Sequence, residues 1–334
     1  MGKHTGHWTR RQANLLGLGA LAGAGFAALA PRAAFAAYPD RPVKLVVPFA
    51  PGGASDIAAR ILSIPLGQAL GQTVFIENRA GANGNIGIAN VAKAEPDGYT
   101  LLVASSVFVV NPTLAKQAAY DPIKDFATIS NLGSSPNVII TRTDSGIKDF
   151  ADLVAKARTN PERYNFSSSG QGSITQLSIE LIKIRLNIKM VHVPYSGAGP
   201  AVQAVLAGTV PLGGVNIAAA IENIKSGTLK ALVQTGEKRW PDLPDVPTLA
   251  EAGLPNAEAE TFQALFAPAG TPKEIVDRLA KETVDILRRP EIQARLQSAG
   301  LGVVAFGPEA LAARVTRDVA TWKDVIEKTG LKVE

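Results

Sequence analysis

The sequence has 334 residues and contains no cysteine. The absence of cysteine excludes disulfides, thiolate catalysis and lipid attachment through an N-terminal cysteine. Histidine is also scarce, because only His192 lies outside the first seven positions. It follows the apolar residues Met190 and Val191, and a lone histidine in that setting is more often structural than catalytic. The chain must be stabilised by its apolar core, for which 46% hydrophobic residues are ample.

Motifs for cofactor chemistry and for common hydrolase mechanisms are absent as well. The chain has no Gly-x-Ser-x-Gly elbow, no His-Glu-x-x-His metal motif and no phosphate loop ending in Gly-Lys-Ser/Thr. Gly170-Gln171-Gly172 is not followed by the third glycine of a dinucleotide fingerprint. We therefore expect a non-enzymatic protein with no cofactor and no metal.

The first 36 residues have the composition of an export signal. Arg10-Arg11 precede an apolar run over 13–30 that is diluted by glycine and alanine, and Ala34-Phe35-Ala36 provides a small-x-small cleavage pattern. The run is too weakly hydrophobic for a membrane anchor. We expect a cleavable twin-arginine-type signal peptide over 1–36 and a periplasmic location.

The leader also accounts for most of the net charge. The whole chain has a formal charge of +5, but the leader holds four basic and no acidic residues, which leaves 30 basic and 29 acidic residues elsewhere. A nearly neutral chain without clustered lysine or arginine argues against nucleic acid or an anionic membrane surface as partner.

Short apolar strands alternate with amphipathic helices beyond the leader, which favours sheets flanked by helices in α/β lobes. Changes of character near 134–136 and near Gln263 predict that the chain crosses twice between two lobes. Lobe 1 would comprise 38–135 and 264–334, and lobe 2 would comprise 136–263, with ligands bound in the cleft at the carboxyl ends of strands. Expected strands are 43–47, 73–76, 100–104, 137–141, 164–167, 190–193, 210–215, 229–234, 261–266 and 302–305. Expected helices are 54–70, 84–94, 149–159, 173–186, 198–207, 216–226, 247–252, 272–288, 291–299 and 308–329.

The turn after the first strand, Phe49 to Asp56, is the clearest candidate binding feature. Gly52 and Gly53 have no side chains to block an approaching group, and Ser55 is polar at the start of the following helix. A helix N-terminus carries unpaired N–H groups and a partial positive charge, so it suits an anion. The pattern predicts a site for one end of a small carboxylate.

A second turn repeats this pattern after the strand that ends near Ser167. Ser168, Ser169 and Ser173 offer hydroxyl groups, while the glycines, Gly172 among them, expose backbone N–H groups. Such a turn binds a carboxylate through neutral donors and the helix dipole, without arginine. The alternative is ordinary helix capping by Ser173 or Ser169.

Three further residues are candidates for the border of the site. Asp56 either pairs with Arg60 four residues later or orders waters and donors around a ligand. Tyr195, between a strand and the next helix, either closes over a ligand or packs between lobes. Ser105 follows the third strand and lines the side of lobe 1.

The order and spacing of seven segments resemble the Bug family, the periplasmic solute-binding proteins of tripartite tricarboxylate transporters. The likeness covers residues 38 to 334. The segments are Tyr38–Pro42, Pro48–Asp56, Glu77–Gly84, Glu95–Thr100, His192–Gly197, Pro244–Leu254 and Ala267–Pro272.

This resemblance implies a two-lobed Venus-flytrap protein of type II-like architecture, each lobe a mixed sheet flanked by helices. It implies a monomer that holds a small carboxylic acid and delivers it to membrane subunits of the transporter, with one carboxylate met by the two turns and by bridging waters. The chain departs from the family at Gln176, where histidine is common, and at Pro211, where aspartate is common. The expected ligand-binding residues are Phe49, Gly52, Gly53, Ser55, Asp56, Ser105, Ser168, Ser169, Gly172, Ser173 and Tyr195.

Two other functions stay open at this point. In the first, the closed form presents the bound carboxylate to a receptor kinase, as a sensor. In the second, less favoured, Ser55 or Ser169 is the nucleophile of a serine hydrolase, against which the single histidine and the missing elbow count.

A charge-reversal test follows from the second turn. Ser169→Asp should abolish ligand binding and leave the fold intact, because it places like charge against the ligand carboxylate. Calorimetry with a carboxylic acid checks this, and unchanged affinity would contradict the assignment.

Overall fold

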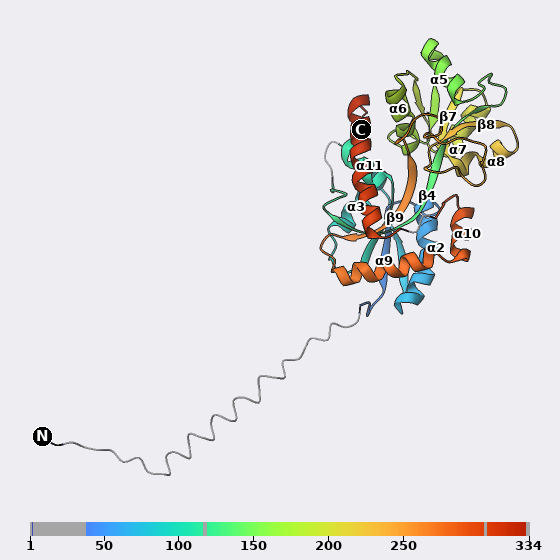
Figure 1. The fold of residues 1–334 in the computed structure, drawn as a ribbon. Helices are drawn as coiled ribbons and strands as arrows, with labels where there is room; N and C mark the ends of the chain where they lie inside the picture. Colours follow the sequence, from blue (N-terminus) through green and yellow to red (C-terminus); the bar gives the residue numbers. More distant parts are fainter. Residues whose placement is uncertain (1, 3–37, 116–118, 304–305, 332–334) are drawn as a thin grey trace. The chain divides into compact units, whose positions relative to one another are not determined.

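The computed structural model describes residue 2, residues 38–115, 119–303 and 306–331. The predicted signal peptide therefore lies outside the described residues. Residues 41–334 form one compact unit. It contains alternating strands and helices, as Figure 1 shows.

Strands and helices occur largely where the sequence predicts them. The strands are β1 (Val43–Val47), β2 (Val74–Asn78), β3 (Thr100–Ser105), β4 (Phe126–Arg142), β5 (Phe166–Ser168), β6 (His192–Pro194), β7 (Leu212–Asn216), β8 (Leu229–Gln234) and β9 (Glu260–Pro268). The helices are α2 (Ala54–Leu70), α3 (Asn85–Ala92), α4 (Val107–Leu114), α5 (Phe150–Thr159), α6 (Ile174–Leu186), α7 (Ala198–Leu206), α8 (Ile217–Lys225), α9 (Lys273–Leu287), α10 (Pro290–Ser298) and α11 (Pro308–Thr329). Short 3-10 turns occupy Ala82–Gly84 and Pro161–Arg163.

The molecule is an α/β protein with two lobes, and one long strand belongs to both. Residues 126–136 of β4 pair with β9, whereas residues 137–142 pair with β7 and β8. The sheet order is β2-β1-β3-β9-β4-β7-β5-β6, with β8 added on β4. In Figure 1, β4 and β9 run between a part with α2, α9 and α10 and a part with α5, α7 and α8.

The pairing directions determine which strand ends meet. β1 and β3 are parallel to each other and antiparallel to β9, so their carboxyl ends point toward the β5–β7 part of the sheet. β7 is antiparallel to β4 and parallel to β5, so the carboxyl ends of β5 and β7 point the opposite way. The turns after β1 and β5 therefore both lie toward the place where β4 passes from one half to the other.

Four parts of the predicted secondary structure were wrong. The prediction missed residues 126–136 of β4, a stretch rich in serine and asparagine that includes Pro136, and it missed α4, an apolar segment containing Pro112. Residues 247–252 are not a helix, because Thr248 and Glu251 close a single turn through Glu251 N–H to Thr248 Oγ1 and Thr248 N–H to Glu251 Oε2. Residues 302–303 form no strand, and Gly302 makes only an isolated bridge to Ser134.

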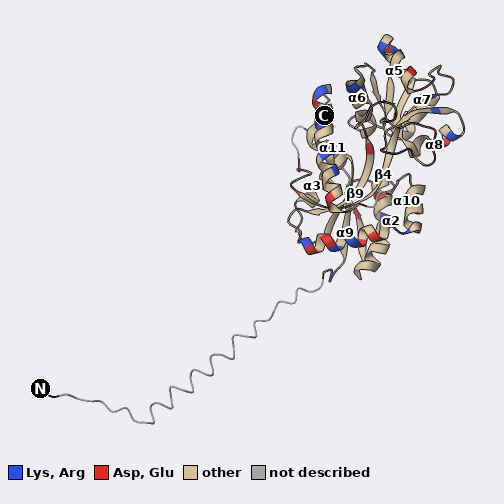
Figure 2. Ribbon diagram, in the orientation of Figure 1, with Lys and Arg blue, Asp and Glu red and all other residues tan. Residues whose placement is uncertain are grey.

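The core lies between the sheet and its helices, and charge is kept outside. Leu45, Val46 and Val47 of β1 are fully buried, and Phe108 stacks on Phe266 with ring centroids 4.4 Å apart. Lysine, arginine, aspartate and glutamate lie mainly on helices such as α9 (Figure 2). There they form exposed pairs at i, i+4 spacing, which contribute little each.

Close contacts at two glycines fix the positions of α3 and α6. A methyl group on Gly87 of α3 would lie 2.7 Å from the Arg79 carbonyl oxygen and 2.8 Å from Pro48 Cβ. A methyl group on Gly214 of β7 would lie 2.7 Å from Ile179 Cδ1 and 2.8 Å from the Thr175 carbonyl oxygen. Glycine therefore lets the first turn of α6 sit directly on β7.

We expect Gly214→Ala to lower the free energy of unfolding by about 1–3 kcal/mol, because the added methyl group overpacks the α6–β7 contact. Gly199→Ala is the matched control, since no atom lies within 4 Å of a methyl group on that exposed helical residue. The control should be neutral or slightly stabilising. Urea unfolding monitored by circular dichroism measures both, and equal stability of the two variants would contradict the close packing.

Candidate functional site

The first predicted turn has an internal brace. Gly52 adopts φ of 90°, a left-handed conformation, and its N–H donates to Asp56 Oδ2 at 2.9 Å. Asn78 at the end of β2 donates to Asp56 Oδ1 at 3.0 Å and to the Phe49 carbonyl oxygen at 3.1 Å. The turn is therefore held at both ends by side chains from neighbouring segments.

Asp56 is a structural residue of this turn. Its carboxylate also accepts from Arg60 Nε at 2.8 Å, and the residue is only 2% exposed. The hydrogen bond from Arg60 lowers the pKa of Asp56 to about 2, helped by the bonds from Gly52 and Asn78, although burial opposes the shift. With both oxygens engaged, Asp56 shapes the turn and pairs with Arg60, the first of its two predicted roles.

The N-terminus of α2 is open. Its N-cap residue is Gly53, which provides no capping side chain, and the exposed residues Gly52 and Gly53 leave the approach free. Within the described chain, no hydrogen bond engages the N–H groups of Gly53, Ala54 or Ser55. These donors, together with the dipole of a 17-residue helix, have the chemistry that suits an anion.

The second turn is more tightly closed. Ser173 is the N-cap of α6, and its hydroxyl accepts from Gln176 N–H and donates to the Gly170 carbonyl oxygen. Gly172 N–H donates to Gln176 Oε1 at 2.7 Å. Gln176 thus takes the position in this turn that Asp56 takes in the first, and the predicted donors Gly172 and Ser173 are engaged internally.

The hydroxyl group of Ser168 also has internal partners, and His192 is one of them. Ser168 is fully buried, and its Oγ lies 2.7 Å from His192 Nε2 and 3.2 Å from Gly170 N, whose N–H donates to it. His192 itself packs on Phe166, with ring centroids 5.0 Å apart. Burial, and secondarily the Lys183 charge, lowers the pKa of His192 to about 4, so the ring is neutral at pH 7.

Ser169 is the donor that the second turn leaves free. Its N–H donates to Thr175 Oγ1 at 3.1 Å, but its hydroxyl oxygen is buried without a hydrogen-bond partner among the described residues. A buried hydroxyl without a partner costs free energy, so such groups are usually satisfied by water or by a ligand. Ser169 therefore stands out among the serines of this turn.

The remaining predicted residues lie around these two turns. Phe49 is half-buried and would touch a methyl group on Gly84 at 3.2 Å, and Tyr195 donates its N–H to the Ser168 carbonyl oxygen at 3.2 Å. Ser105 lies at the end of β3, directly opposite Gln263 of β9. Ser55 donates to Gln263 Oε1 at 2.6 Å. The prediction used Gln263 only to mark a lobe boundary and missed it as a site residue, because an isolated glutamine in a strand carries no sequence signal.

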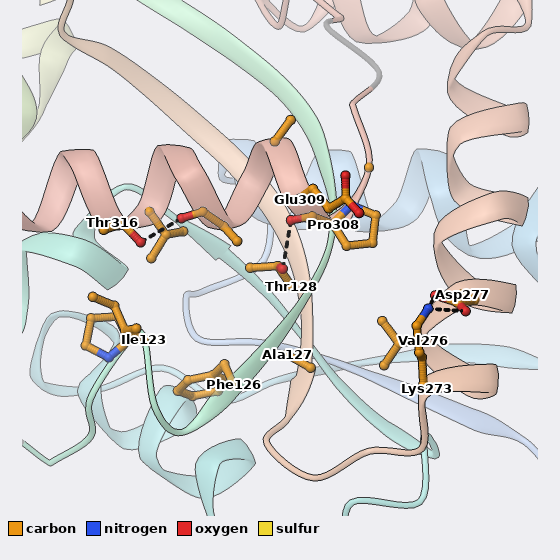
Figure 3. Close-up of a pocket in the computed structure, with 15 residues that line it drawn as sticks. Ile123, Phe126, Ala127, Thr128, Lys273, Val276, Asp277, Pro308, Glu309 and Thr316 are labelled. Atoms are coloured by element: carbon orange, nitrogen blue, oxygen red, sulfur yellow. Dashed lines mark hydrogen bonds and ion pairs between the residues drawn. The ribbon is translucent and has the colours of Figure 1, made fainter.

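One surface cavity lies away from the two turns. A cavity of about 610 Å³ lies between residues 122–128, α9 and α11 (Figure 3). Its lining includes Phe126 and Val276, while Thr128 Oγ1 donates to the Pro308 carbonyl oxygen at 2.9 Å. It contains none of the predicted binding residues, so it plays no part in the site built here.

In the described part of the chain, no group of three or more histidine, cysteine, aspartate or glutamate side chains is arranged to hold a metal ion. Among the same residues, no helix is both long enough and apolar enough to span a bilayer.

Comparison with known proteins assigns the family. The family model described as "Tripartite tricarboxylate transporter family receptor" (TctC) matches residues 58–331, so the chain belongs to this family of periplasmic solute-binding receptors. The UPF0065 protein in the tcbD-tcbE intergenic region of Pseudomonas sp. (strain P51) is 38% identical over 87% of each chain. Protein BugT of Bordetella pertussis is 34% identical over 89% of this chain and 92% of its own.

A solved structure agrees with the fold. MatC from Rhodopseudomonas palustris with bound malate is 34% identical, covers 86% of this chain and 100% of its own, and superposes with a TM-score of 0.70. The predicted Bug-family membership and the two-lobed fold are thereby confirmed.

The state of His192 gives a pH-dependent prediction. The pKa of His192 in the folded chain lies below the ordinary 6.5, so at lower pH the unfolded chain binds this proton more readily than the folded chain does. Titration of His192 therefore leaves the free energy of unfolding unchanged above pH 6.5 and lowers it as pH falls toward 4. His192→Gln keeps a hydrogen-bonding side chain without the titration. We expect it to flatten the fall in unfolding free energy over this window by about 1–3 kcal/mol. Urea titrations between pH 4 and 7.5 test this, and identical pH profiles for variant and parent would contradict it.

Proposed function

We propose that this protein is a periplasmic receptor that captures a small carboxylic acid between its lobes and delivers it to membrane subunits of a tripartite tricarboxylate-type transporter. The observation that carries the proposal is the open N-terminus of α2, where the N–H groups of Gly53, Ala54 and Ser55 have no acceptor in the described chain. A carboxylate oxygen is the acceptor that best suits several converging N–H groups at a helix N-terminus.

The opposite lobe supplies a complementary donor. The carboxyl ends of β1 and β5 point toward each other across the strand crossing, and in the proposed receptor the turns after them border one cleft. In the proposed complex, the Ser169 hydroxyl donates to the carboxylate that the α2 N-terminus binds. Phe49 and Tyr195 border the ligand, and the braces Asp56, Gln176 and Ser173 hold the turns in shape.

The lobe boundaries of the proposal follow β4 and β9. We assign 38–135 with 264–334 to lobe 1 and 136–263 to lobe 2, which agrees with the change of β4 partners between Pro136 and Asn137. Lobe closure is then a hinge motion, and the ligand favours the closed state because only that state offers donors from both turns. We propose that the receptor acts as a monomer, exported by the signal peptide at 1–36.

Family and fold support binding rather than catalysis. The chain belongs to a receptor family, and its relative MatC was solved with malate. The serine that contacts the single histidine is Ser168, which is fully buried and therefore inaccessible to an ester or amide. Ser55 instead donates to Gln263, and Ser169 has no histidine beside it. These contacts disfavour the serine hydrolase.

A thermal-shift screen of the mature chain tests the proposal. Small mono- and dicarboxylates, malate included, should raise Tm, because a ligand that binds only the folded state at 100 times its Kd adds about 2.7 kcal/mol of stability. Malamide, the diamide of malate, is the matched control because it retains the carbon skeleton and lacks both carboxylates. Absence of a shift with every acid, or equal shifts with malamide, would contradict a carboxylate site.

A further inference from the structure

The strand β9 presents two chemically different faces at the lobe crossing. Its side chains alternate, so Thr261 and Gln263 lie on one face and Glu260 and Phe262 on the other. The second face meets α11. There Arg314 Cζ lies 4.8 Å from the Phe262 ring centroid, and Arg314 Nη2 lies 3.4 Å from Glu260 Oε2. All charged contacts of this stretch are therefore on the α11 face.

The face with Gln263 carries an uncharged hydrogen-bonding cluster. Ser105 stands directly opposite Gln263 in an antiparallel pair, so the two side chains share one face of the sheet. Ser55 Oγ donates to Gln263 Oε1 at 2.6 Å, which orients the amide. Gln263 is 2% exposed, yet in the described chain its amide nitrogen donates no hydrogen bond, and the Ser105 hydroxyl has no partner either.

The same face continues into lobe 2. Asn216 at the end of β7 donates from Nδ2 to Thr261 Oγ1 at 3.2 Å and to Asn137 Oδ1 at 3.0 Å. Asn137 is the first residue of β4 that pairs with β7, and it donates to the Ala259 carbonyl oxygen at 2.8 Å. The polar side chains on this face, from Asn137 to Gln263, are thus uncharged. They lie at the carboxyl ends of β3 and β7.

We propose that Gln263 and Ser105 form a second, uncharged subsite at the floor of the cleft, which binds an oxygen atom at the far end of the ligand. This inference rests on the proposed function and deepens it: the ligand class becomes carboxylic acids with a second oxygen-bearing group, a carboxylate or a carbonyl. The amide nitrogen of Gln263 and the hydroxyl of Ser105 supply the donors. Ser55 acts as a positioning residue that keeps the amide oxygen turned away from the ligand.

Unused donors at this place carry the inference. The Gln263 amide nitrogen has no acceptor in the described chain, and it is not among the fully buried polar atoms without a partner. Part of its surface therefore faces solvent, and it can donate to a ligand beside the open helix N-terminus. Ser55 links the two subsites, since its N–H belongs to the open end of α2 and its hydroxyl binds Gln263. A ligand held by both subsites therefore spans from the turn of lobe 1 to β9 at the lobe crossing.

Matched acids separate the two subsites. The four-carbon set is butyrate, which has one carboxylate, with succinate and succinamate, which add a second carboxylate or a carboxamide at the far end. The six-carbon set is hexanoate and adipate. Calorimetry with the full mature chain should give at least one set in which the acids with a second oxygen group bind roughly tenfold tighter than the monoacid, the size expected from one or two buried hydrogen bonds.

Substitution of the floor residues should remove that preference. Gln263→Met should weaken the acids with a second oxygen group more than the monoacid and bring the affinity ratio within about threefold, because it removes the amide donor and leaves the N–H groups of the α2 N-terminus in place. Gln263→Glu keeps an acceptor for Ser55 and replaces the amide donor by a negative charge, so it should weaken succinate or adipate more than succinamate. Ser105→Ala should reduce the ratio partly.

Ser106→Ala is the matched control for Ser105→Ala. The Ser106 hydroxyl accepts from Phe262 N–H at 2.7 Å and faces the backbone of β9, so its loss should lower stability and leave the affinity ratio unchanged. Equal losses for monoacid and diacid in Gln263→Met, or an unchanged ratio in both Gln263 variants, would overturn the subsite while the carboxylate site stands. If the parent chain binds none of these acids, the proposed function fails and the subsite with it.

Discussion

The sharing of β4 between two sets of partners is the constraint on which the rest of the structure depends. β9 pairs with one half of this strand and β7 with the other. The strands β3 and β1 are then oriented by their pairing through β9, and β5 by its pairing with β7. The carboxyl ends of β1 and β3 must then face those of β5 and β7. Loops at the carboxyl ends of strands are where α/β proteins bind ligands, so a single shared strand suffices to bring two such edges together.

The crossing also accounts for several buried polar side chains. Where β4 changes partners, its backbone needs substitutes for ladder hydrogen bonds, and side chains provide them. Asn137 N–H donates to Thr235 Oγ1 at 2.9 Å, and Phe262 N–H donates to Ser106 Oγ. Such paired groups stabilise the crossing, whereas the amide nitrogen of Gln263 and the hydroxyl of Ser169 have no partner in the described chain.

Much of this could be predicted from the sequence, and the failures have physical causes. β1, β8, α2 and α11 follow the sequence patterns to the residue, because their apolar periodicity and their proline and glycine boundaries are local signals. The first half of β4 was missed, since its Ser130, Asn131 and Pro136 have low strand propensity and are stabilised by tertiary pairing alone. Both turns were found from their glycine and serine pattern. Which of their donors remain free depends on side chains such as Asp56 and Gln176, whose contacts the sequence does not reveal.

The turns after β1 and β5 are held by equivalent hydrogen bonds that different residues accept. In each, the residue at the third helical position accepts a hydrogen bond from the N–H of a glycine four residues earlier, Asp56 from Gly52 and Gln176 from Gly172. The charge of Asp56 is balanced by Arg60, whereas neutral Gln176 needs no cation in its buried position. Gln176 therefore braces the second turn as Asp56 braces the first. The remaining difference lies in the caps: Ser173 closes the N-terminus of α6, and Gly53 leaves that of α2 open. In the proposed site, lobe 1 then contributes main-chain donors and lobe 2 a hydroxyl, so the selectivity among acids must come from the side chains between them.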